Sequence, residues 1–376
     1  MKSDPSCDET FMRRALSLAA HGRYTTSPNP RVGAVIVSQT EPVVVGEGYH
    51  KRAGEPHAEI LAIESAGEAA RQSCLYVNLE PCCHHGRTPP CVDAILKAGI
   101  SRVVVGMEDP FPEVGGNGIA NLRAAGVQVD VGICEKEARE LNRFFCSLHR
   151  RGRPWVILKM AMSLDGRIAT RTGDSQWISC DTSRAMVHDL RAEVDAVLVG
   201  SETALHDRPH LTARPKNLSP GEFSQPRRIV LDTRGRLLSR LDCIQDIGAA
   251  PLEVLVGSDV EIPKGFSPGD NVKITQAPTE AGHIQPDKVL KVLARENALS
   301  VMIEGGQQVA TSFLEAELVD ELFLFIAPIV LGGSEAPLIC GGHGVYSIKD
   351  ALRLKAMTVQ QVDKDVLIRG RFSDWP

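Results

Sequence analysis

Two segments in the N-terminal half decide the fold: His57-Ala58-Glu59 and Pro81-Cys82-Cys83-His84-His85-Gly86-Arg87-Thr88-Pro89-Pro90-Cys91. They supply an imidazole, two well-spaced thiols and a carboxylate. A catalytic zinc site takes three protein ligands of these types and leaves its fourth position to water, whose pKa falls to about 7. We therefore expect His57, Cys82 and Cys91 to bind zinc and Glu59 to act as the general acid and base.

The segment from His57 to Arg71 has the mixed apolar and charged pattern of a helix, and Pro56 marks its start. On such a helix His57 and Glu59 are about 200° apart, so both can face one cavity only in the first turn. Two alternatives stay open: core thiols beside a surface imidazole, and a closed structural zinc site with His84 or His85 as the fourth ligand. Cys82 is preferred over Cys83 because it directly follows a proline, as in the zinc-deaminase signature.

Length and composition limit the classes of function. A chain of 376 residues predicts two domains, and 43% hydrophobic with 24% charged residues is ordinary for a globular protein. The net charge of −5 gives no overall basic surface for nucleic acid. Ten cysteines are dispersed along the chain, which favours a reducing cytoplasm over a disulfide framework. No run approaches the ~18 apolar residues of a membrane span. We expect a cytoplasmic protein that binds neither nucleic acid nor membrane.

Helical and extended patterns alternate through the first 150 residues, which predicts an α/β layered domain. We expect helices over 8–23, 57–71, 90–98, 119–125 and 135–149, and strands over 32–37, 43–49, 75–79, 102–106 and 127–131. The basic stretch from Arg150 to Pro154 contains two helix breakers. It divides the chain into domains 1–150 and 151–376.

The second half has no zinc signature, but its apolar runs alternate with helical patterns and predict a largely parallel sheet. The expected strands cover 155–160, 196–199, 228–231, 252–256, 301–303, 322–326 and 365–371, and the helices cover 181–193, 286–295 and 308–317. Gly305-Gly306 lies between a strand and a helix, where it either approaches a phosphate or makes a plain turn. The apolar run 318–333 either pairs subunits or forms a buried strand.

Nearly the whole chain resembles the bifunctional deaminase/reductase family of bacterial riboflavin biosynthesis. The resemblance rests, in order, on motifs at 28–33, 57–59, 81–91, 163–166, 175–178 and 304–306. The spacing between Cys82 and Cys91 is specific, since most deaminase relatives have a tighter Pro-Cys-x-x-Cys. The resemblance implies an N-terminal cytidine-deaminase-like α/β/α sandwich and a C-terminal dihydrofolate-reductase-like α/β domain, in a homodimer or homotetramer.

The implied activity has two steps. The first domain, with Zn²⁺, would deaminate 2,5-diamino-6-(5-phosphoribosylamino)pyrimidin-4(3H)-one. The second, with NADPH, would reduce the ribosyl chain to give 5-amino-6-(5-phosphoribitylamino)uracil. The alternative is a deaminase for a related small pyrimidine or purine, whose second domain is inactive as a reductase and serves binding or oligomerisation.

The resemblance also assigns roles to individual residues. Asn29 and His84 would contact the deaminase substrate. The positions that would contact NADPH are Ala161, Trp177, Thr203, Asp207, Gly305 and Gly306. The positions that would contact the reductase substrate are Lys159, Ser175, Arg191, Leu211, Arg214 and Glu304. Three residues depart from the family pattern: Cys83, Phe111 and Arg208.

Overall fold

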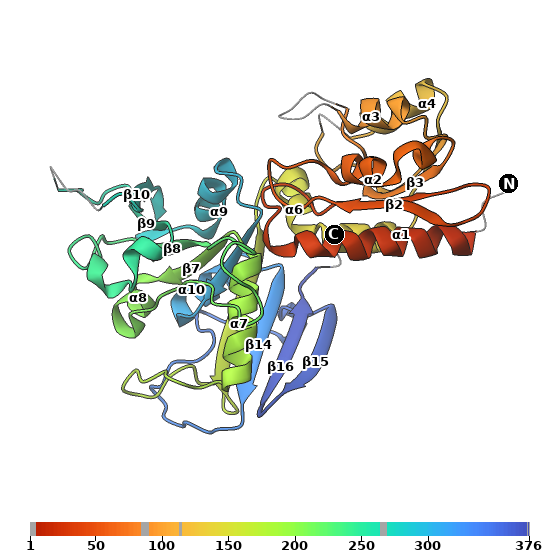
Figure 1. Ribbon diagram of the computed structural model, residues 1–376. Coiled ribbons are helices and arrows are strands. Elements are labelled where there is room, and N and C mark those ends of the chain that lie inside the picture. The colour runs from red at the N-terminus through yellow and green to blue at the C-terminus, as the bar shows by residue number, and fades with distance from the viewer. Residues whose placement is uncertain (1–4, 84–89, 113–114, 264–268, 374, 376) are drawn as a thin grey trace. The chain divides into compact units, whose positions relative to one another are not determined.

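The computed structural model describes residues 5–83, 90–112, 115–263, 269–373 and 375. The chain forms two compact units, residues 1–152 and 153–375, and each is described by itself. Figure 1 shows the elements of both.

Unit 1 contains a five-stranded mixed sheet in the order β2-β1-β3-β4-β5. The strands are β1 (Gly33–Val37), β2 (Val44–Tyr49), β3 (Cys74–Leu79), β4 (Arg102–Met107) and β5 (Gln128–Val131). β1 is antiparallel to both β2 and β3, whereas β3, β4 and β5 run parallel. The helices are α1 (Pro5–Ala19), α2 (Ala58–Ala66), α3 (Cys91–Lys97), α4 (Asn117–Ala124), α5 (Glu135–Leu141) and α6 (Arg143–Arg151).

Alternating side chains of this sheet build two cores. Ala34 and Ile36 face one side with apolar residues of α2, α3 and α4, while Val35 and Val37 face the other side with α1. This period of two is what a strand buried on both faces produces. The α/β/α sandwich predicted from the sequence is therefore confirmed, with α1 on one side of the sheet and α3 and α4 on the other (Figure 1).

Two predicted helices are shorter than expected. The helix expected from His57 ends at Ala66, because the next residue, Gly67, has a positive φ of 54°. Gly67 also begins a 3₁₀ turn, η2 (Gly67–Ala70). The prediction of one helix over 135–149 is wrong, because Asn142 separates α5 from α6. The side chain of Asn142 accepts a hydrogen bond from the Arg31 amide and donates one to the Arg31 carbonyl, at 2.8 and 3.0 Å.

Unit 2 contains a nine-stranded sheet in the order β10-β9-β8-β7-β13-β6-β14-β16-β15. Its strands are β6 (Trp155–Ser163), β7 (Ala196–Gly200), β8 (Arg227–Asp232), β9 (Leu252–Gly257), β10 (Val272–Ala277), β13 (Ser300–Glu304), β14 (Glu321–Ala327), β15 (Ala356–Val362) and β16 (Asp365–Arg371). Neighbouring strands are parallel along the order β10-β9-β8-β7-β13-β6-β14, and β16 and β15 add an antiparallel edge. The expectation of a largely parallel sheet is confirmed.

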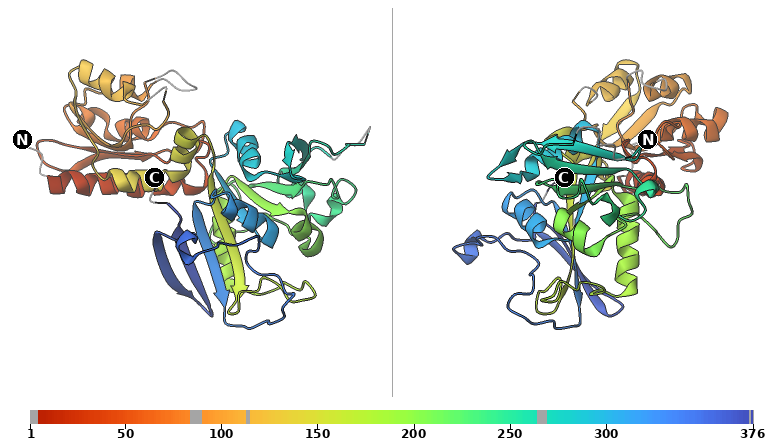
Figure 2. Two further views of the ribbon diagram at one scale, coloured as in Figure 1. Left: turned by 180° about the vertical axis from the view of Figure 1, so that it is seen from behind. Right: turned by 90° about the vertical axis from the view of Figure 1, so that its left-hand side faces the viewer.

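Helices cover both faces of this sheet. They are α7 (Asp181–Glu193), α8 (Ser201–Asp207), α9 (Pro286–Arg295) and α10 (Gln307–Glu315), and a small hairpin joins β11 (Thr279–Glu280) to β12 (His283–Ile284). α9 and α10 pack on the main core of the unit. Comparison of Figure 1 with the left view of Figure 2 places α7 on the opposite face.

The apolar run 318–333 contains β14, which pairs with β6 on one side and β16 on the other. The run therefore includes a strand inside the sheet of this unit, and both edges of that strand are occupied. β10 and β15 were not expected. Six of the seven residues of β15 are exposed, so no buried face marks this strand in the sequence.

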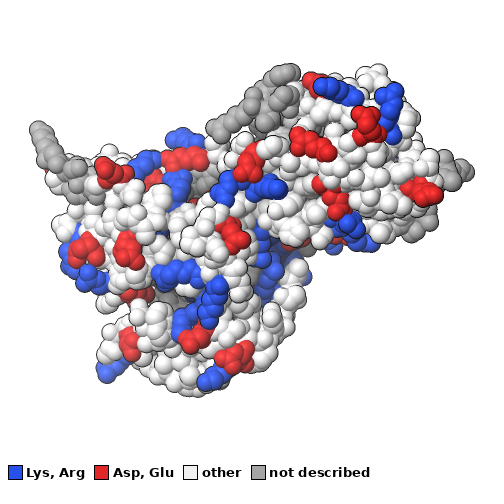
Figure 3. Space-filling model, in the orientation of Figure 1, with Lys and Arg blue, Asp and Glu red and all other residues white. Residues whose placement is uncertain are grey.

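Within the described part of the chain, no helix is both long enough and apolar enough to cross a membrane. Lysine and arginine are interspersed with aspartate and glutamate over the face visible in Figure 3. This distribution agrees with the absence of a basic excess in the composition.

Candidate active sites

The three expected zinc ligands meet in unit 1. His57 precedes the first residue of α2, Cys82 follows β3, and Cys91 is the first residue of α3. The His57 Nδ1 atom lies 3.2 Å from Cys91 Sγ and 3.6 Å from Cys82 Sγ, and all three ligand atoms lie within 4.8 Å of one another. Tetrahedral zinc, with bonds of about 2.0 Å to nitrogen and 2.3 Å to sulfur, requires separations of roughly 3.5–3.8 Å. The residues therefore fit zinc.

Hydrogen bonds stabilise a thiolate at Cys82. Its sulfur accepts from the Cys91 backbone amide at 3.4 Å and lies within reach of the Cys91 thiol and His57. The Cys91 and His57 contacts lower the pKa of Cys82 to about 4, although burial opposes them. The interaction with Cys82 also raises the pKa of His57. Cys82 is thus shifted toward the thiolate, the form that binds a cation, whereas zinc binding at His57 would require loss of the proton that its raised pKa favours.

Glu59 lies in the first turn of α2, with only 3% of its surface exposed. Burial, together with the nearby Cys82, raises its pKa to about 7. A carboxyl group with such a pKa can both take up and release a proton near neutrality. The close packing of α2 on β2 fixes this turn, since a Cβ on Gly48 would lie 2.6 Å from the Ala58 carbonyl.

Asn29 is held by a residue that the sequence did not reveal. Its amide nitrogen lies 3.0 Å from His50 Nε2, and His50 Nδ1 lies 3.1 Å from the Pro56 carbonyl. The carbonyl can only accept, so Nδ1 carries the hydrogen and Nε2 accepts from Asn29. The His50 ring is edge-on to His57, with centroids 5.4 Å apart. His50 thus connects the 28–33 motif to the start of α2, a link without any signal in residue spacing.

His84, the other expected substrate contact, lies outside the described residues. Two of the three unusual residues lie in this unit. Cys83 is half-buried and packs against the core beneath α2 and α3, where burial raises its pKa. The Phe111 ring packs on His149 with centroids 5.0 Å apart.

In unit 2, Glu304 is the centre of a charged cluster. It ends β13, and its carboxylate accepts two hydrogen bonds from the Arg191 guanidinium of α7, at 2.5 and 2.8 Å. Lys159 lies on the neighbouring strand β6 in register with Glu304, with its Nζ 3.7 Å from the carboxylate. Burial alone would raise the pKa of Glu304, but Arg191 and Lys159 hold it down at about 2.

The segment after α8 joins this cluster. Arg191 donates to the Thr212 carbonyl at 3.1 Å, and Arg214 donates to the Thr212 hydroxyl at 2.9 Å. Leu211 is buried and takes a positive φ of 56° at the start of this turn. The cluster holds more cationic than anionic side chains, and arginine is well suited to phosphate.

The residues expected to bind the cofactor come from three strand ends. A Cβ on Gly306 would lie 3.0 Å from the Thr203 hydroxyl, and Gly305 and Gly306 both have positive φ, so this turn requires glycine. Ser175 donates to Asp207 at 3.1 Å. The half-buried Ala161 lies two residues beyond Lys159 on β6.

Two further side chains of this unit point to the surface. Trp177 is 68% exposed, and the Arg184 guanidinium lies over its ring at 4.7 Å. Arg208, the third unusual residue, contacts Asp242 at the surface.

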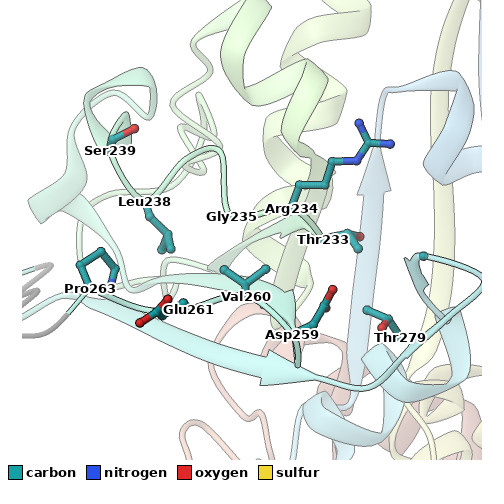
Figure 4. Close-up of a pocket in the computed structure, with 11 residues that line it drawn as sticks. Thr233, Arg234, Gly235, Leu238, Ser239, Asp259, Val260, Glu261, Pro263 and Thr279 are labelled. Atoms are coloured by element: carbon teal, nitrogen blue, oxygen red, sulfur yellow. The ribbon is translucent and has the colours of Figure 1, made fainter.

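A cavity of about 940 Å³ lies beyond the carboxyl ends of β8 and β9. Figure 4 shows Thr233, Asp259 and Thr279 near one end and Leu238, Glu261 and Pro263 near the other. The segments that line this cavity contain no motif that the sequence analysis recognised. It opens at the same edge of the sheet as Thr203, because β7, β8 and β9 are parallel.

Comparisons with known proteins cover both units. The model of the cytidine and deoxycytidylate deaminase zinc-binding region matches residues 5–107, and that of the RibD C-terminal domain matches residues 154–368. The riboflavin biosynthesis protein RibD of Escherichia coli (strain K12) is 41% identical over 369 residues, covering 96% of this chain and 98% of its own. That of Aquifex aeolicus (strain VF5) is 41% identical over 361 residues, covering 96% and 97%.

Solved structures give the same result over both units. Acinetobacter baumannii RibD (form 2) has a TM-score of 0.88 at 36% identity, covering 98% of this chain and 99% of that one. The Thermotoga maritima diaminohydroxyphosphoribosylaminopyrimidine deaminase/5-amino-6-(5-phosphoribosylamino)uracil reductase has a TM-score of 0.84 at 35% identity, with the same coverage. The chain thus belongs to the RibD family, the bifunctional deaminase/reductases of riboflavin biosynthesis.

Proposed function

We propose that unit 1 hydrolyses the 2-amino group of 2,5-diamino-6-(5-phosphoribosylamino)pyrimidin-4(3H)-one and that unit 2 then reduces the ribosyl chain to ribityl with NADPH. The observation that carries the proposal is the convergence of His57, Cys82 and Cys91 beside the buried Glu59. The charged cluster around Glu304 supports the second step, and disfavours a second unit kept only for binding.

In the deaminase site, His57, Cys82 and Cys91 hold zinc, which when bound lowers the pKa of a water molecule to about 7. Glu59 takes a proton from the attacking water and later delivers it to the leaving amino group. Its raised pKa suits both transfers. His50 fixes the Asn29 amide, which leaves the amide oxygen of Asn29 to accept a hydrogen bond from the pyrimidine.

In the reductase site, Arg191 and Arg214 bind the 5′-phosphate, and Glu304 and Lys159 orient the sugar. NADPH supplies the hydride that reaches the sugar carbon C1′. Gly305 and Gly306 let the backbone approach the cofactor's phosphates beside Thr203. Ala161, Asp207 and the exposed Trp177 would contact NADPH, and Ser175 and Leu211 would contact the sugar of the substrate.

We assign the cavity beyond β8 and β9 to the adenosine end of NADPH. It lies at the strand ends next to Thr203, along the edge where parallel α/β sheets bind nucleotides. Arg234 borders the cavity without a hydrogen-bonding or ion-pair partner among the described residues, and Figure 4 shows its side chain extending away from the other lining side chains. We propose that this guanidinium turns toward the cofactor's 2′-phosphate.

We also propose a cytoplasmic homo-oligomer. All ten cysteines are free, as a reducing compartment maintains them. β15 is the edge strand of unit 2, and it exposes 59% of Met357 and 61% of Val359. An exposed edge of this kind pairs readily with another strand, and here we assign it to a second copy. Light scattering of wild-type protein and Val359→Lys tests this, since the variant is expected to dissociate.

The two-step activity is tested by supplying the diaminopyrimidine phosphate with and without NADPH. Without NADPH we expect one equivalent of ammonia and the deaminated ribosyl product by mass. With NADPH we expect the ribityl product and one equivalent of oxidised cofactor. Ammonia release without any NADPH oxidation contradicts the proposal for unit 2.

A further inference from the structure

The motif Ser163-Leu164-Asp165-Gly166 has no role in the proposed chemistry, yet it is tightly organised. It forms the turn at the end of β6, and Asp165 is exposed rather than directed into the site. The Asp165 carboxylate accepts hydrogen bonds from the Ser163 hydroxyl at 2.7 Å, the Leu331 amide at 3.0 Å and the Gly332 amide at 2.8 Å. One carboxylate therefore connects two segments that are more than 160 residues apart in sequence.

Backbone hydrogen bonds extend this connection. The Leu164 amide donates to the Ile329 carbonyl at 2.8 Å, the Ile168 amide to Pro337 at 3.0 Å, and the Ile339 amide to Gly166 at 3.2 Å. The turn after β6 is thus joined to residues 328–344, which we call the strap. In Figure 1 the loops after β6 and β14 lie together at the same end of the sheet, as these contacts require.

Both joined segments lead to the proposed reductase site. Downstream of the turn, the loop 167–180 carries Ser175, which is bonded to Asp207, and then Trp177. The strap continues past α10, where the Gly341 amide donates to the Thr311 hydroxyl at 2.8 Å and the Gly341 backbone lies against Gln307. Gln307 directly follows the Gly305-Gly306 turn. The strap and the loop therefore border the cofactor site from two sides.

We propose that Asp165 is a positioning residue for the reduction step: by joining the β6 turn to the strap, it holds the loop of Ser175 and Trp177 in the conformation that binds NADPH. The inference rests on the proposed function of unit 2. Hydrogen bonds to an ionised carboxylate are about twice as strong as those between neutral groups. These bonds lower the pKa of Asp165 to about 2, so it accepts all of them near neutrality.

The test compares Asp165→Asn with Asp363→Asn. Asp363 lies in the turn between β15 and β16, and it belongs to neither proposed site. Asparagine at 165 replaces one acceptor oxygen with a donor that opposes a backbone amide. We expect the KM for NADPH to rise about tenfold, as loss of charged hydrogen bonds implies. The deamination rate of Asp165→Asn should match that of the wild type. Asp363→Asn should match the wild type in both deamination and the KM for NADPH.

A second measurement does not depend on activity. Arg171 lies exposed in the loop, so trypsin cleavage after Arg171 reports how firmly the loop is held. We expect trypsin to cleave after Arg171 faster in Asp165→Asn than in the wild type. An NADPH concentration that protects the wild type from this cleavage should not protect the variant. Ser163→Ala removes only one of the three hydrogen bonds and should give a smaller change in the same direction.

The possible failures are distinguishable. If the wild type oxidises no NADPH with the deaminated substrate, the proposed function of unit 2 is wrong, and the cleavage rates still test the hydrogen-bonded connection. If the wild type is active and Asp165→Asn matches it in KM and in cleavage, the role of Asp165 is refuted. A fall in kcat with the KM for NADPH unchanged also refutes it.

Discussion

Replacing Arg191 with methionine should destabilise unit 2 in a way that depends on pH. Arg191 and Glu304 form a buried pair, with side chains 13% and 8% exposed. The pKa of Glu304 falls from its ordinary 4.5 to about 2. Because a tenfold change in an equilibrium constant corresponds to about 1.4 kcal/mol, ionised Glu304 in its folded surroundings, with Arg191 as the main partner and Lys159 as a second one, contributes about 3 kcal/mol at neutral pH. Breaking buried pairs generally costs a similar ~3–5 kcal/mol.

The sign follows from the lower pKa of Glu304 in the folded state. Its contribution is fully present above about pH 4.5, where the carboxyl is ionised in both folded and unfolded chains. It is lost as the pH falls toward the folded value of about 2. The difference in the free energy of unfolding between wild type and Arg191→Met should therefore shrink between pH 5 and about pH 3. Above pH 5 it should rise further until Glu304 of the variant is also ionised, because without Arg191 burial raises the pKa of this carboxyl.

Tryptophan fluorescence is the appropriate assay. All three tryptophans, Trp155, Trp177 and Trp375, lie in unit 2, so urea unfolding followed by their emission reports on this unit alone. Arg208→Met is the matched control, since its ion pair with Asp242 is exposed and should contribute ~1 kcal/mol or less. A loss below 1 kcal/mol for Arg191→Met, or a loss independent of pH, would refute the reasoning.

Three further predictions concern the two sites. Glu59→Gln should reduce deamination by about a hundredfold or more while zinc content and NADPH oxidation stay unchanged; equal loss of both activities would contradict separate sites. Cys82→Ser should lose zinc, measured by elemental analysis, whereas Cys83→Ser should keep it, because Cys83 is outside the ligand group. Arg234→Ala should raise the KM for NADPH about tenfold and leave the KM for NADH unchanged. Equal effects on both KM values would show that Arg234 does not bind the 2′-phosphate.

The zinc ligands could be predicted because their geometry is largely local. His57 and Glu59 share the first turn of one helix, and proline immediately before Cys82 and Cys91 marks where each ligand enters the site. His50 could not be predicted in the same way. Its role depends on the packing of β2 beside the 28–33 loop and on the carbonyl of Pro56, and neither contact leaves a pattern along the chain.

Errors in the predicted elements have similar causes. Both sides of Asn142 have good helix formers, so propensity favours one helix, and the break depends on the tertiary hydrogen bonds between Asn142 and Arg31. β15 was missed because its side chains are exposed on both faces, so its sequence lacks the alternation that marks a half-buried strand. Hydrophobic periodicity detects burial, and it fails where a strand is not buried.

The reductase site shows why knowing the fold class helps to predict a site even when the contacts between its residues are unknown. Lys159 and Glu304 are far apart in sequence, but both end up beside each other because β6 and β13 are parallel neighbours in register. Parallel strands bring their carboxyl ends to one edge, so polar residues there converge. The order of the strands, however, decides which residues meet, and it is β13, inserted between β7 and β6, that places Glu304 within reach of Lys159. Arg191 then completes the cluster, because α7 connects β6 to β7 across the position that β13 occupies.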